Sequence, residues 1–305
     1  MNNNNQAANL WDKLKVLPQY FIPQHFLTSL VYRLTRCETP WFKNFIINQF
    51  IKVFKVDMSL ALNPDPESYS SFNTFFTREL SADARPIQLD EKNILCPVDG
   101  SVSQIGNIAK KNDNDDTIIQ AKGKSYTLKH LLLEDELVNM FSGGTFATLY
   151  LAPKDYHRIH MPISGKLSCM IYVPGKLFAV NAHTARAVNA VFAKNERVIN
   201  IFHTDIGPMA MIMVGALFVG SMETVWAGQI TPAKDRIIID THFSDNDIKL
   251  EQGQEMGRFN MGSTVILLFP KDVMQWSTEM VADKTIIMGE KIARVNTDLN
   301  VSDTL

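Results

Sequence analysis

The spacing of hydrophobic and polar residues changes character along the chain. Between residues 10 and 56, apolar side chains recur at three- and four-residue intervals, which is the period of an amphipathic α-helix. Leu30 and Leu34 share one face of a first helix. Thr39 followed by Pro40 marks the start of a second, as an N-cap and a first helical residue. The pattern therefore predicts two helices in this segment.

From about residue 94 onward, short β-rich runs alternate with turn residues. The predicted strands are 102–105, 117–121, 145–151, 165–173, 197–202, 209–219, 236–239, 264–269 and 284–287. One helix is predicted over 128–141. This alternation favours an antiparallel, β-dominated core over a βαβ repeat. The predicted fold class is α+β, with N-terminal amphipathic helices.

A cluster of structure-breaking residues at 63–68, rich in proline and aspartate, marks a boundary between the helical segment and the rest of the chain. We predict a disordered polar lead over residues 1–9, a helical segment over 10–62 and one larger domain over 63–305. The longest apolar run, 209–220, is too short to span a bilayer and is interpreted as a core segment.

Charge and aromatic residues are unevenly distributed. The whole chain has a net charge of −2, which gives no indication of a nucleic-acid partner. Residues 10–56, however, hold seven basic and two acidic residues and 10 of the 29 aromatic ones. Such helices lie either in a membrane interface, with lysines near anionic lipid, or on the protein's own core. The pattern alone favours neither interpretation.

Several residues that can carry chemistry stand in the β-rich part. Ser263 follows Gly262 at the entrance to a strand, where an adjacent base can activate its hydroxyl. His157 and His160 are the best general bases of the chain, and Asp99 supplies a carboxylate. Together they have the composition of an Asp-His-Ser relay.

Purely structural roles for these residues also remain open. Asp99-Gly100 between apolar runs is normally a hairpin turn, and a Gly-Ser-Thr tripeptide commonly marks a turn into a strand. The GxSxG elbow of a serine hydrolase is absent around Ser263. The three cysteines are widely spaced, so no metal site is predicted, and a reducing compartment is indicated.

A resemblance to a known family covers roughly residues 10–287. The motifs that carry it are Phe72-Asn73-Thr74-Phe75-Phe76-Thr77-Arg78, Pro97-Val98-Asp99-Gly100, Gln120-Ala121-Lys122-Gly123, Asp155-Tyr156-His157-Arg158-Ile159-His160-Met161-Pro162, Asn195-Glu196-Arg197-Val198, Val214-Gly215-Ala216, Glu223-Thr224-Val225-Trp226-Ala227-Gly228 and Gly257-Arg258-Phe259 leading to Gly262-Ser263-Thr264. In this order they resemble the bacterial-type phosphatidylserine decarboxylases, which are self-cleaving pyruvoyl enzymes. The family most often has leucine where this chain has Met261, a swap that conserves volume.

The resemblance implies that the chain cuts itself. Ser263 would attack the carbonyl of Gly262, and the resulting ester would eliminate to leave a pyruvoyl group at position 263. The products would be a β subunit, residues 1–262, and an α subunit, residues 263–305. The pyruvoyl ketone would then form a Schiff base with the serine headgroup and withdraw electrons as CO₂ leaves. The product would be phosphatidylethanolamine.

The resemblance also implies a role for each site residue. Asp99 and His160 match the residues that assist self-cleavage, completing the relay with Ser263. His157 matches the group that protonates the carbanion left by CO₂, or that assists imine formation.

A diacyl substrate makes the membrane interpretation of residues 10–62 outweigh the core interpretation. The implied partners are phosphatidylserine and an anionic membrane surface, with no nucleic acid. The implied location is peripheral, on the cytoplasmic face of the bacterial inner membrane. The two fragments would remain together as a heterodimer, and further dimerisation of that pair is left open.

Two other functions remain open on sequence grounds. One is a serine hydrolase that uses Asp99, His160 and Ser263 on an external ester. The other is a peripheral lipid-binding protein whose glycine-serine turn is structural. A denaturing gel with intact mass separates all three, because only the pyruvoyl enzyme yields two fragments, the smaller one with a blocked N-terminus.

Overall fold

The computed structural model describes residues 8–87, 89–110, 116–217, 221–231, 237–243, 248–260 and 263–296. Its helices are α1 (Leu10–Phe21), α2 (Gln24–Thr35), α3 (Pro40–Phe54), α4 (Phe72–Phe76), α5 (Leu128–Leu132), α6 (Asp135–Phe141), α7 (Ala182–Ala187) and α8 (Val191–Lys194), with 3-10 turns at η1 (Met58–Leu60) and η2 (Pro66–Ser68). Its strands are β1 (Asn93–Leu95), β2 (Gly100–Asn107), β3 (Ala109–Lys110), β4 (Asp116–Ala121), β5 (Lys124–Thr127), β6 (Thr145–Tyr150), β7 (Arg158–His160), β8 (Gly165–Val173), β9 (Arg197–Thr204), β10 (Gly207–Val214), β11 (Met222–Thr224), β12 (Gly228–Gln229), β13 (Ile239–His242), β14 (Lys249–Leu250), β15 (Glu255–Phe259), β16 (Thr264–Phe269), β17 (Met274–Trp276), β18 (Thr285–Ile286) and β19 (Lys291–Val295). The predicted α+β, β-dominated class is confirmed.

A central antiparallel sheet carries the hydrophobic core. Its strands lie in the order β13-β8-β9-β10-β16-β6-β2-β18, and β14 also pairs with β8. In the middle, β16 lies between β10 and β6 and is buried along its whole length. A strand covered on both faces has a continuous apolar sequence rather than an alternating one. The strand predicted at 264–269 is confirmed with those bounds for this reason, and the strand predicted at 165–173 is also confirmed with its bounds.

Three smaller antiparallel sheets flank the central one, in the orders β1-β19-β17, β12-β11-β15-β7 and β3-β4-β5. The second of these leads to the candidate site, because β15 ends just before Ser263 and pairs with β7, which contains His160. At Gly257 of β15, an added Cβ would lie 2.3 Å from the carbonyl oxygen of Glu223. Only glycine allows β11 and β15 to approach this closely.

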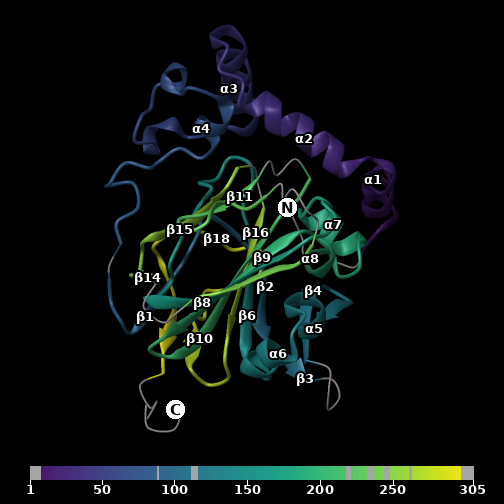
Figure 1. Ribbon diagram of the computed structural model, residues 1–305, viewed down its shortest axis with the longest axis vertical. Coiled ribbons are helices and arrows are strands. Elements are labelled where there is room, and N and C mark those ends of the chain that lie inside the picture. The colour runs from purple at the N-terminus through teal and green to yellow at the C-terminus, as the bar shows by residue number, and fades with distance from the viewer. Residues whose placement is uncertain are drawn as a thin grey trace.

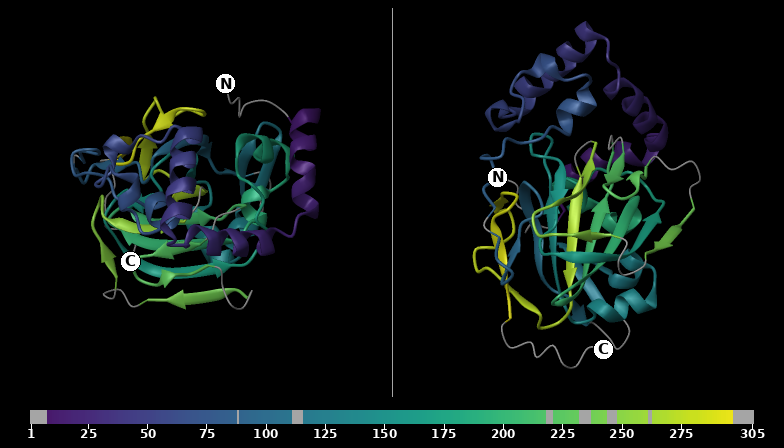
Figure 2. Two further views of the ribbon diagram at one scale, coloured as in Figure 1. Left: turned by 90° about the horizontal axis from the view of Figure 1, so that it is seen from above. Right: turned by 60° about the vertical axis from the view of Figure 1, so that its left-hand side comes forward.

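Helices α1, α2 and α3 form what we call the helical arm. It lies over the end of the central sheet at which β16 begins (Figure 1). The view from above shows the helices in front of that end (Figure 2). Asp12 of α1, only 2% exposed, accepts two 2.9 Å hydrogen bonds from Arg186 of α7 and contacts His183 at 2.6 Å. The Arg186 guanidinium holds the pKa of Asp12 well below its usual range. The first helix of the arm is therefore fastened to the core.

At its other end, the helical arm packs on α4. Ile47 of α3 is buried in a cluster with Phe72, Phe75 and Phe76 of α4. The ring of Phe50 adds edge-on contacts to all three phenylalanines, with centroid distances of 5.1–6.1 Å. This side of α3 therefore matches the core interpretation of the sequence, while the opposite side stays exposed.

The N-terminal segment contains three helices rather than the two predicted. The missed helix, α1, begins at a capping box between Asn9 and Asp12, and Pro18 interrupts its pattern. Asn9 therefore belongs to the cap of a helix rather than to the predicted disordered lead, whose residues 1–7 lie outside the described part of the chain. Thr39 does precede α3, with Pro40 first in the helix, but its side chain makes no capping hydrogen bond.

Other local predictions were wrong. The strand predicted over 209–219 ends at Val214, and only Ile239 of the strand predicted over 236–239 lies in a strand of the described residues, β13. The single helix predicted over 128–141 is split into α5 and α6, because Leu133 takes a left-handed φ of 70° between them. Asp99-Gly100 is not a hairpin turn, since β1 before it pairs with β19 while β2 after it pairs with β6 and β18. Among the helices of the described residues, none combines the length and hydrophobicity needed to cross a bilayer.

Candidate active site

Ser263 lies immediately before β16, at the end of the central sheet that faces the helical arm (Figure 1). Its carbonyl accepts a 2.9 Å hydrogen bond from the backbone N–H of Leu151, so the backbone is held against the end of β6. The side chain is fully buried, and its hydroxyl has no hydrogen-bond partner. A buried hydroxyl without a hydrogen-bond partner is costly and calls for an explanation. Met261 and Gly262 lie outside the described residues.

Asp99 reaches the same end of the sheet from the other side of β6. Ser101 of β2 and Thr264 of β16 both pair with Tyr150, so Asp99 and Ser263 stand two strand spacings apart, about 10 Å between backbones. Gly100 makes this approach possible, because an added Cβ would lie 2.2 Å from the Tyr150 carbonyl oxygen. The sheet order therefore brings residues 99 and 263 to one edge.

The carboxylate of Asp99 is held by an arginine that the sequence did not single out. Arg85 donates through Nε to Oδ1 at 3.0 Å and through Nη2 to Oδ2, and the backbone N–H of Met288 donates to Oδ1 at 2.8 Å. This hydrogen bonding raises the pKa of Arg85. No signal in the sequence linked Arg85 to Asp99.

His160, on β7, has both ring nitrogens occupied. Nδ1 lies 2.8 Å from the carbonyl oxygen of Gly253, which can only accept, so Nδ1 carries the proton. Nε2 then accepts from the Tyr156 hydroxyl at 3.0 Å. Burial lowers the pKa of His160, which favours this neutral form. A backbone hydrogen bond from His160 to Pro97 also ties β7 to the chain just before Asp99.

His157 differs from His160 in having a free ring nitrogen. Its Nδ1 donates to the Asp155 carbonyl at 2.8 Å, and its ring packs on Phe76 at a centroid distance of 4.1 Å. Nε2 is buried without a hydrogen-bond partner. Burial, with a smaller contribution from the charge of Arg78, lowers the pKa of His157 to about 3. At neutral pH, His157 is therefore a neutral imidazole whose Nε2 lone pair has no hydrogen-bond partner.

The four residues singled out in the sequence thus share one end of the fold, but not one hydrogen-bond chain. Within the described residues, no hydrogen bond joins Asp99 to His160 or His160 to Ser263. Among these four residues, the buried side-chain atoms without hydrogen-bond partners are His157 Nε2 and Ser263 Oγ. The relay of Asp99, His160 and Ser263 therefore stays a prediction, and in this arrangement His160 would have to release Tyr156 to act on Ser263.

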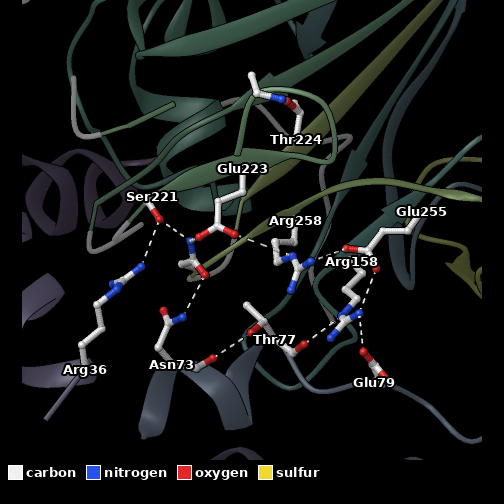
Figure 3. Close-up of polar contacts among 12 residues, drawn as sticks. Arg36, Asn73, Thr77, Glu79, Arg158, Ser221, Glu223, Thr224, Glu255 and Arg258 are labelled. Carbon is white, nitrogen blue, oxygen red and sulfur yellow. Dashed lines mark hydrogen bonds and ion pairs between the residues drawn. The ribbon is translucent and has the colours of Figure 1, made fainter. Parts of the chain in front are cut away.

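A polar network supports the backbone that leads into Ser263. Arg158 of β7 donates to Thr77 at 2.9 Å and to Glu255 at 2.8 Å, and pairs with Glu79 at 2.9 Å. Figure 3 shows these contacts together with that of Arg36, from the helical arm, to Ser221 at 3.2 Å. The network therefore links the arm, α4 and β15 around the site.

The same network holds Asn260, three residues before Ser263. The Asn260 side chain accepts from Asn73 of α4 at 3.0 Å and donates to Glu223 at 2.8 Å. Asn260 also donates a hydrogen bond to the hydroxyl of Ser221, and the same hydroxyl accepts a second hydrogen bond from Arg36. The segment entering the site is therefore fixed from three sides.

One further cluster of possible metal ligands lies elsewhere among the described residues. Cys169 of β8 is brought close to Asp240 and His242 of β13, with ligand atoms within 4.8 Å of one another. His242 Nε2 already lies 3.1 Å from the Asp240 carboxylate, a contact that needs no ion. The sequence treated Cys169 as isolated and gave no sign of this neighbourhood.

The burial of His157 predicts how stability depends on pH. The unfolded chain binds a proton at this residue near pH 6.5 and the folded chain only near pH 3, so the unfolded state holds more protons between these values. The free energy of unfolding should therefore fall as pH drops below 6.5. From pH 7.5 to 5.5 this loss is about 1.4 kcal/mol for one residue.

Urea unfolding at the two pH values, in a Ser263→Ala background chosen to keep the chain in one piece, measures this loss. Adding His157→Gln should make the acid-induced loss smaller by about 1 kcal/mol. Equal losses with and without His157→Gln would show that the imidazole is not held neutral by the fold.

Buried groups with free polar atoms, gathered at one end of a rigid sheet, are typical of an enzyme rather than a structural module. The comparisons with known proteins identify the enzyme class as a carboxy-lyase. The phosphatidylserine decarboxylase family model matches residues 72–294, and a second model, described as PSD, matches residues 14–55. The chain belongs to the phosphatidylserine decarboxylase family.

Curated relatives agree with this assignment. A phosphatidylserine decarboxylase proenzyme of Saccharophagus degradans is 47% identical over 94% of this chain and 99% of its own length. The proenzyme of Nitrosococcus oceani is 46% identical over 96% of this chain and 95% of its own. That of Alkalilimnicola ehrlichii is 53% identical over 84% of this chain and 88% of its own.

Proposed function

We propose that this chain is a self-processing, pyruvoyl-dependent enzyme that converts phosphatidylserine to phosphatidylethanolamine and CO₂ at a membrane surface. The observation that carries the proposal is the partnerless, fully buried hydroxyl of Ser263 at the head of β16. Its relatives are named proenzymes, a term that fits a chain activated by cleavage.

In the proposed maturation, Ser263 Oγ forms an ester bond to the carbonyl carbon of residue 262 as the peptide C–N bond breaks. Loss of the α-proton of residue 263 then expels the carboxylate of residue 262. Water converts the remaining dehydroalanine to a ketone and releases ammonia. Residues 1–262 and 263–305 stay together, because β16 remains paired with β6 and β10. The catalytic domain proposed for residues 63–305 would thus consist of residues 63–262 of the larger fragment and the whole of the smaller one.

The residues around position 263 fit a pyruvoyl group. The serine hydroxyl makes no hydrogen bond that its conversion would break, and His157 offers a free Nε2 in the same buried region. The group supplies a ketone that withdraws electrons while the substrate carboxylate leaves as CO₂. His157, with its free Nε2, would either assist formation of the imine with the substrate amine or deliver a proton to the carbon that lost CO₂.

Asp99 and His160 are proposed to act during maturation. His160 would accept the hydroxyl proton of Ser263 at Nε2 after releasing Tyr156, while Nδ1 stays bonded to Gly253. Asp99, fixed by Arg85, would supply negative charge that favours the imidazolium. This charge acts on His160 through space, and it opposes the lowering of the His160 pKa by burial.

A direct assay tests the overall reaction. Phosphatidylserine labelled at the serine carboxyl should release labelled CO₂ when incubated with the purified protein, leaving phosphatidylethanolamine. A serine hydrolase would release fatty acid or headgroup without CO₂, and a lipid-binding protein would change nothing. Either of those results would overturn the proposal.

The helical arm is proposed to bind the membrane. Its helices expose many large apolar side chains to the outside: Leu10, Trp11, Leu14, Leu17, Tyr20, Phe21, Phe26, Leu30, Leu34, Trp41, Phe45, Val53 and Phe54. A groove of about 400 Å³ shares Leu34, Phe45, Val53 and Phe54 with this surface. Such an extended apolar surface is unusual on a protein that meets only water.

Charge on the helical arm complements an anionic bilayer. Five of its seven basic residues are exposed: Lys13, Lys15, Arg33, Lys52 and Lys55. Each adds roughly 1 kcal/mol near an anionic surface at low salt. Of the other two, Lys43 is buried and donates to the carbonyl of Glu67 at 2.8 Å, and Arg36 contacts Ser221. We infer a peripheral association through apolar insertion and charge together.

Replacing Phe21, Phe26 and Trp41 with asparagine should weaken binding to phosphatidylserine-containing vesicles at least tenfold. These side chains are 81%, 69% and 74% exposed, and a fully buried aromatic contributes about 1.5–3 kcal/mol. Vesicle flotation measures the change, with high salt expected to release part of the wild-type protein. A matched triple variant at exposed apolar residues elsewhere, Ile119, Ile237 and Val281 to asparagine, should float like wild type. Equal flotation of both triple variants would exclude the helical arm as the membrane-binding surface.

A further inference from the structure

Arg78 is a buried cation whose hydrogen-bonding groups are left largely unused. It follows α4 and is only 5% exposed. Its Nη2 donates to the carbonyl of Lys154 at 3.3 Å, and its guanidinium lies 5.5 Å from the ring centre of Phe75. Its Nε and Nη1 are buried and have no hydrogen-bond partner. Leaving a buried charge without partners is expensive.

Another buried guanidinium, that of Arg197, is fully satisfied. Arg197, 2% exposed, donates to four backbone carbonyls, those of His130, Leu131, Ala193 and Asn195, at 2.8–3.2 Å. Among the described arginines, Arg78 is the one with partnerless buried nitrogens. A purely structural role therefore does not account for it.

Nearby carboxylates do not neutralise Arg78 by contact. Asp99 is engaged by Arg85, Asp155 accepts from the backbone N–H of Ala152 at 2.7 Å, and Glu79 pairs with Arg158. Burial lowers the pKa of Arg78, yet a guanidinium remains charged at neutral pH. The site therefore has an unmatched positive charge that an anion would balance.

Arg78 follows a helix that links the helical arm to His157. On one side, α4 packs through Phe72 and Phe76 against Phe50 of the helical arm, and Figure 1 shows α4 between the arm and the sheet. On the other side, Phe76 packs on the ring of His157. Arg78 follows this helix and lies close enough to His157 for its charge to lower the pKa of that imidazole.

We propose that Arg78 binds the phosphodiester of the substrate headgroup through its free Nε and Nη1 groups. This inference rests on the proposed decarboxylase function. The carboxylate of the serine headgroup is a less suitable partner for Arg78. An ion pair would stabilise this carboxylate in the substrate but not as it becomes neutral CO₂, so the contact would oppose the reaction. The phosphodiester keeps its charge throughout, so the same contact holds substrate and product.

The experiment compares processed wild type with processed Arg78→Gln, using dihexanoyl lipids that dissolve without vesicles. Dihexanoyl phosphatidylethanolamine has the phosphodiester but no carboxylate. Its Kd, from equilibrium dialysis, should rise about 10- to 100-fold in Arg78→Gln, the usual loss for a hydrogen bond to a charged group. The KM for dihexanoyl phosphatidylserine should rise by a similar factor. Cleavage into two fragments should be unchanged.

Control variants and competitors make the result specific. Arg294→Gln, on an exposed position of β19, removes the same charge and should leave both values as in wild type. Arg78→Lys keeps the charge and should lose less affinity than Arg78→Gln, which covers the case in which Arg78→Gln fails to fold. Inorganic phosphate should displace the wild-type ligand only at far higher concentration than the lipid itself.

Several results would overturn the proposal. One is a raised KM for phosphatidylserine with an unchanged Kd for phosphatidylethanolamine, which would assign Arg78 to the carboxylate. Others are unchanged values for both lipids, or inorganic phosphate that binds as tightly as the lipid. Failure of the proposed function looks different, since wild type would then release no CO₂.

Discussion

Purified wild-type protein is expected to appear on a denaturing gel as two fragments of about 30 and 5 kDa, and Ser263→Ala as one intact chain of 34.4 kDa. The fragment sizes follow from cleavage between residues 262 and 263 at the average residue mass. Alanine has no hydroxyl to attack the preceding carbonyl, so no ester forms at its β-carbon and no elimination to dehydroalanine can follow. Ser263→Ala should therefore release no CO₂ from phosphatidylserine.

Intact mass spectrometry makes this test sharper than the gel. The small fragment should lack a free amino group at its first residue. Thr148→Val is the matched control, because Thr148 of β6 is also fully buried with a partnerless hydroxyl, and valine keeps its shape. It should cleave as wild type does. Cleavage of Ser263→Ala, or a wild type that stays at full length, would contradict self-processing at this bond.

The two histidines are expected to fail at different steps. His160→Ala and Asp99→Ala should accumulate uncut chain, because they remove the proposed base and the charge that supports it. His157→Ala should cleave largely as normal yet release little CO₂, because it removes the free imidazole Nε2. Losing a positioned acid or base typically lowers a rate about 10²–10⁴-fold. A gel time course and a CO₂ assay on the same preparations measure both steps.

The hydrogen bond from Tyr156 to His160 adds a control. Tyr156→Phe removes the competing donor, so cleavage should be at least as fast as in wild type if His160 acts through Nε2. Thermal unfolding of each variant establishes that it is folded. The division of roles is wrong if His157→Ala blocks cleavage while His160→Ala cleaves and remains active.

Local sequence patterns were sufficient for the elements that bury a continuous apolar run. β16 was predicted with its observed bounds because every residue along it is buried, and β8 because most of its residues are. Local patterns were insufficient where a single residue interrupts the helical repeat of apolar positions. Pro18 concealed α1, and Leu133, in a left-handed conformation, divided the helix predicted over 128–141.

The sequence by itself determined the β-dominated class, the apolar and basic character of the N-terminal segment, and the residue types that carry chemistry. It could name Asp99, His157, His160 and Ser263 because each residue's chemistry is a property of its own side chain. The placement of Asp99 and Ser263 at one edge depends on pairing across β2, β6 and β16, and no local pattern encodes such pairing.

Only the tertiary structure decided which atoms are engaged and which are free. Arg85 holds Asp99, Tyr156 occupies His160, and Arg78 and His157 keep buried nitrogens without partners. These differences arise from contacts between segments far apart in the chain and from the desolvation those contacts cause. Desolvation keeps His157 neutral, and it makes the unpaired charge of Arg78 costly enough to favour a bound anion. Both properties therefore depend on how the chain packs and cannot be read from the sequence alone.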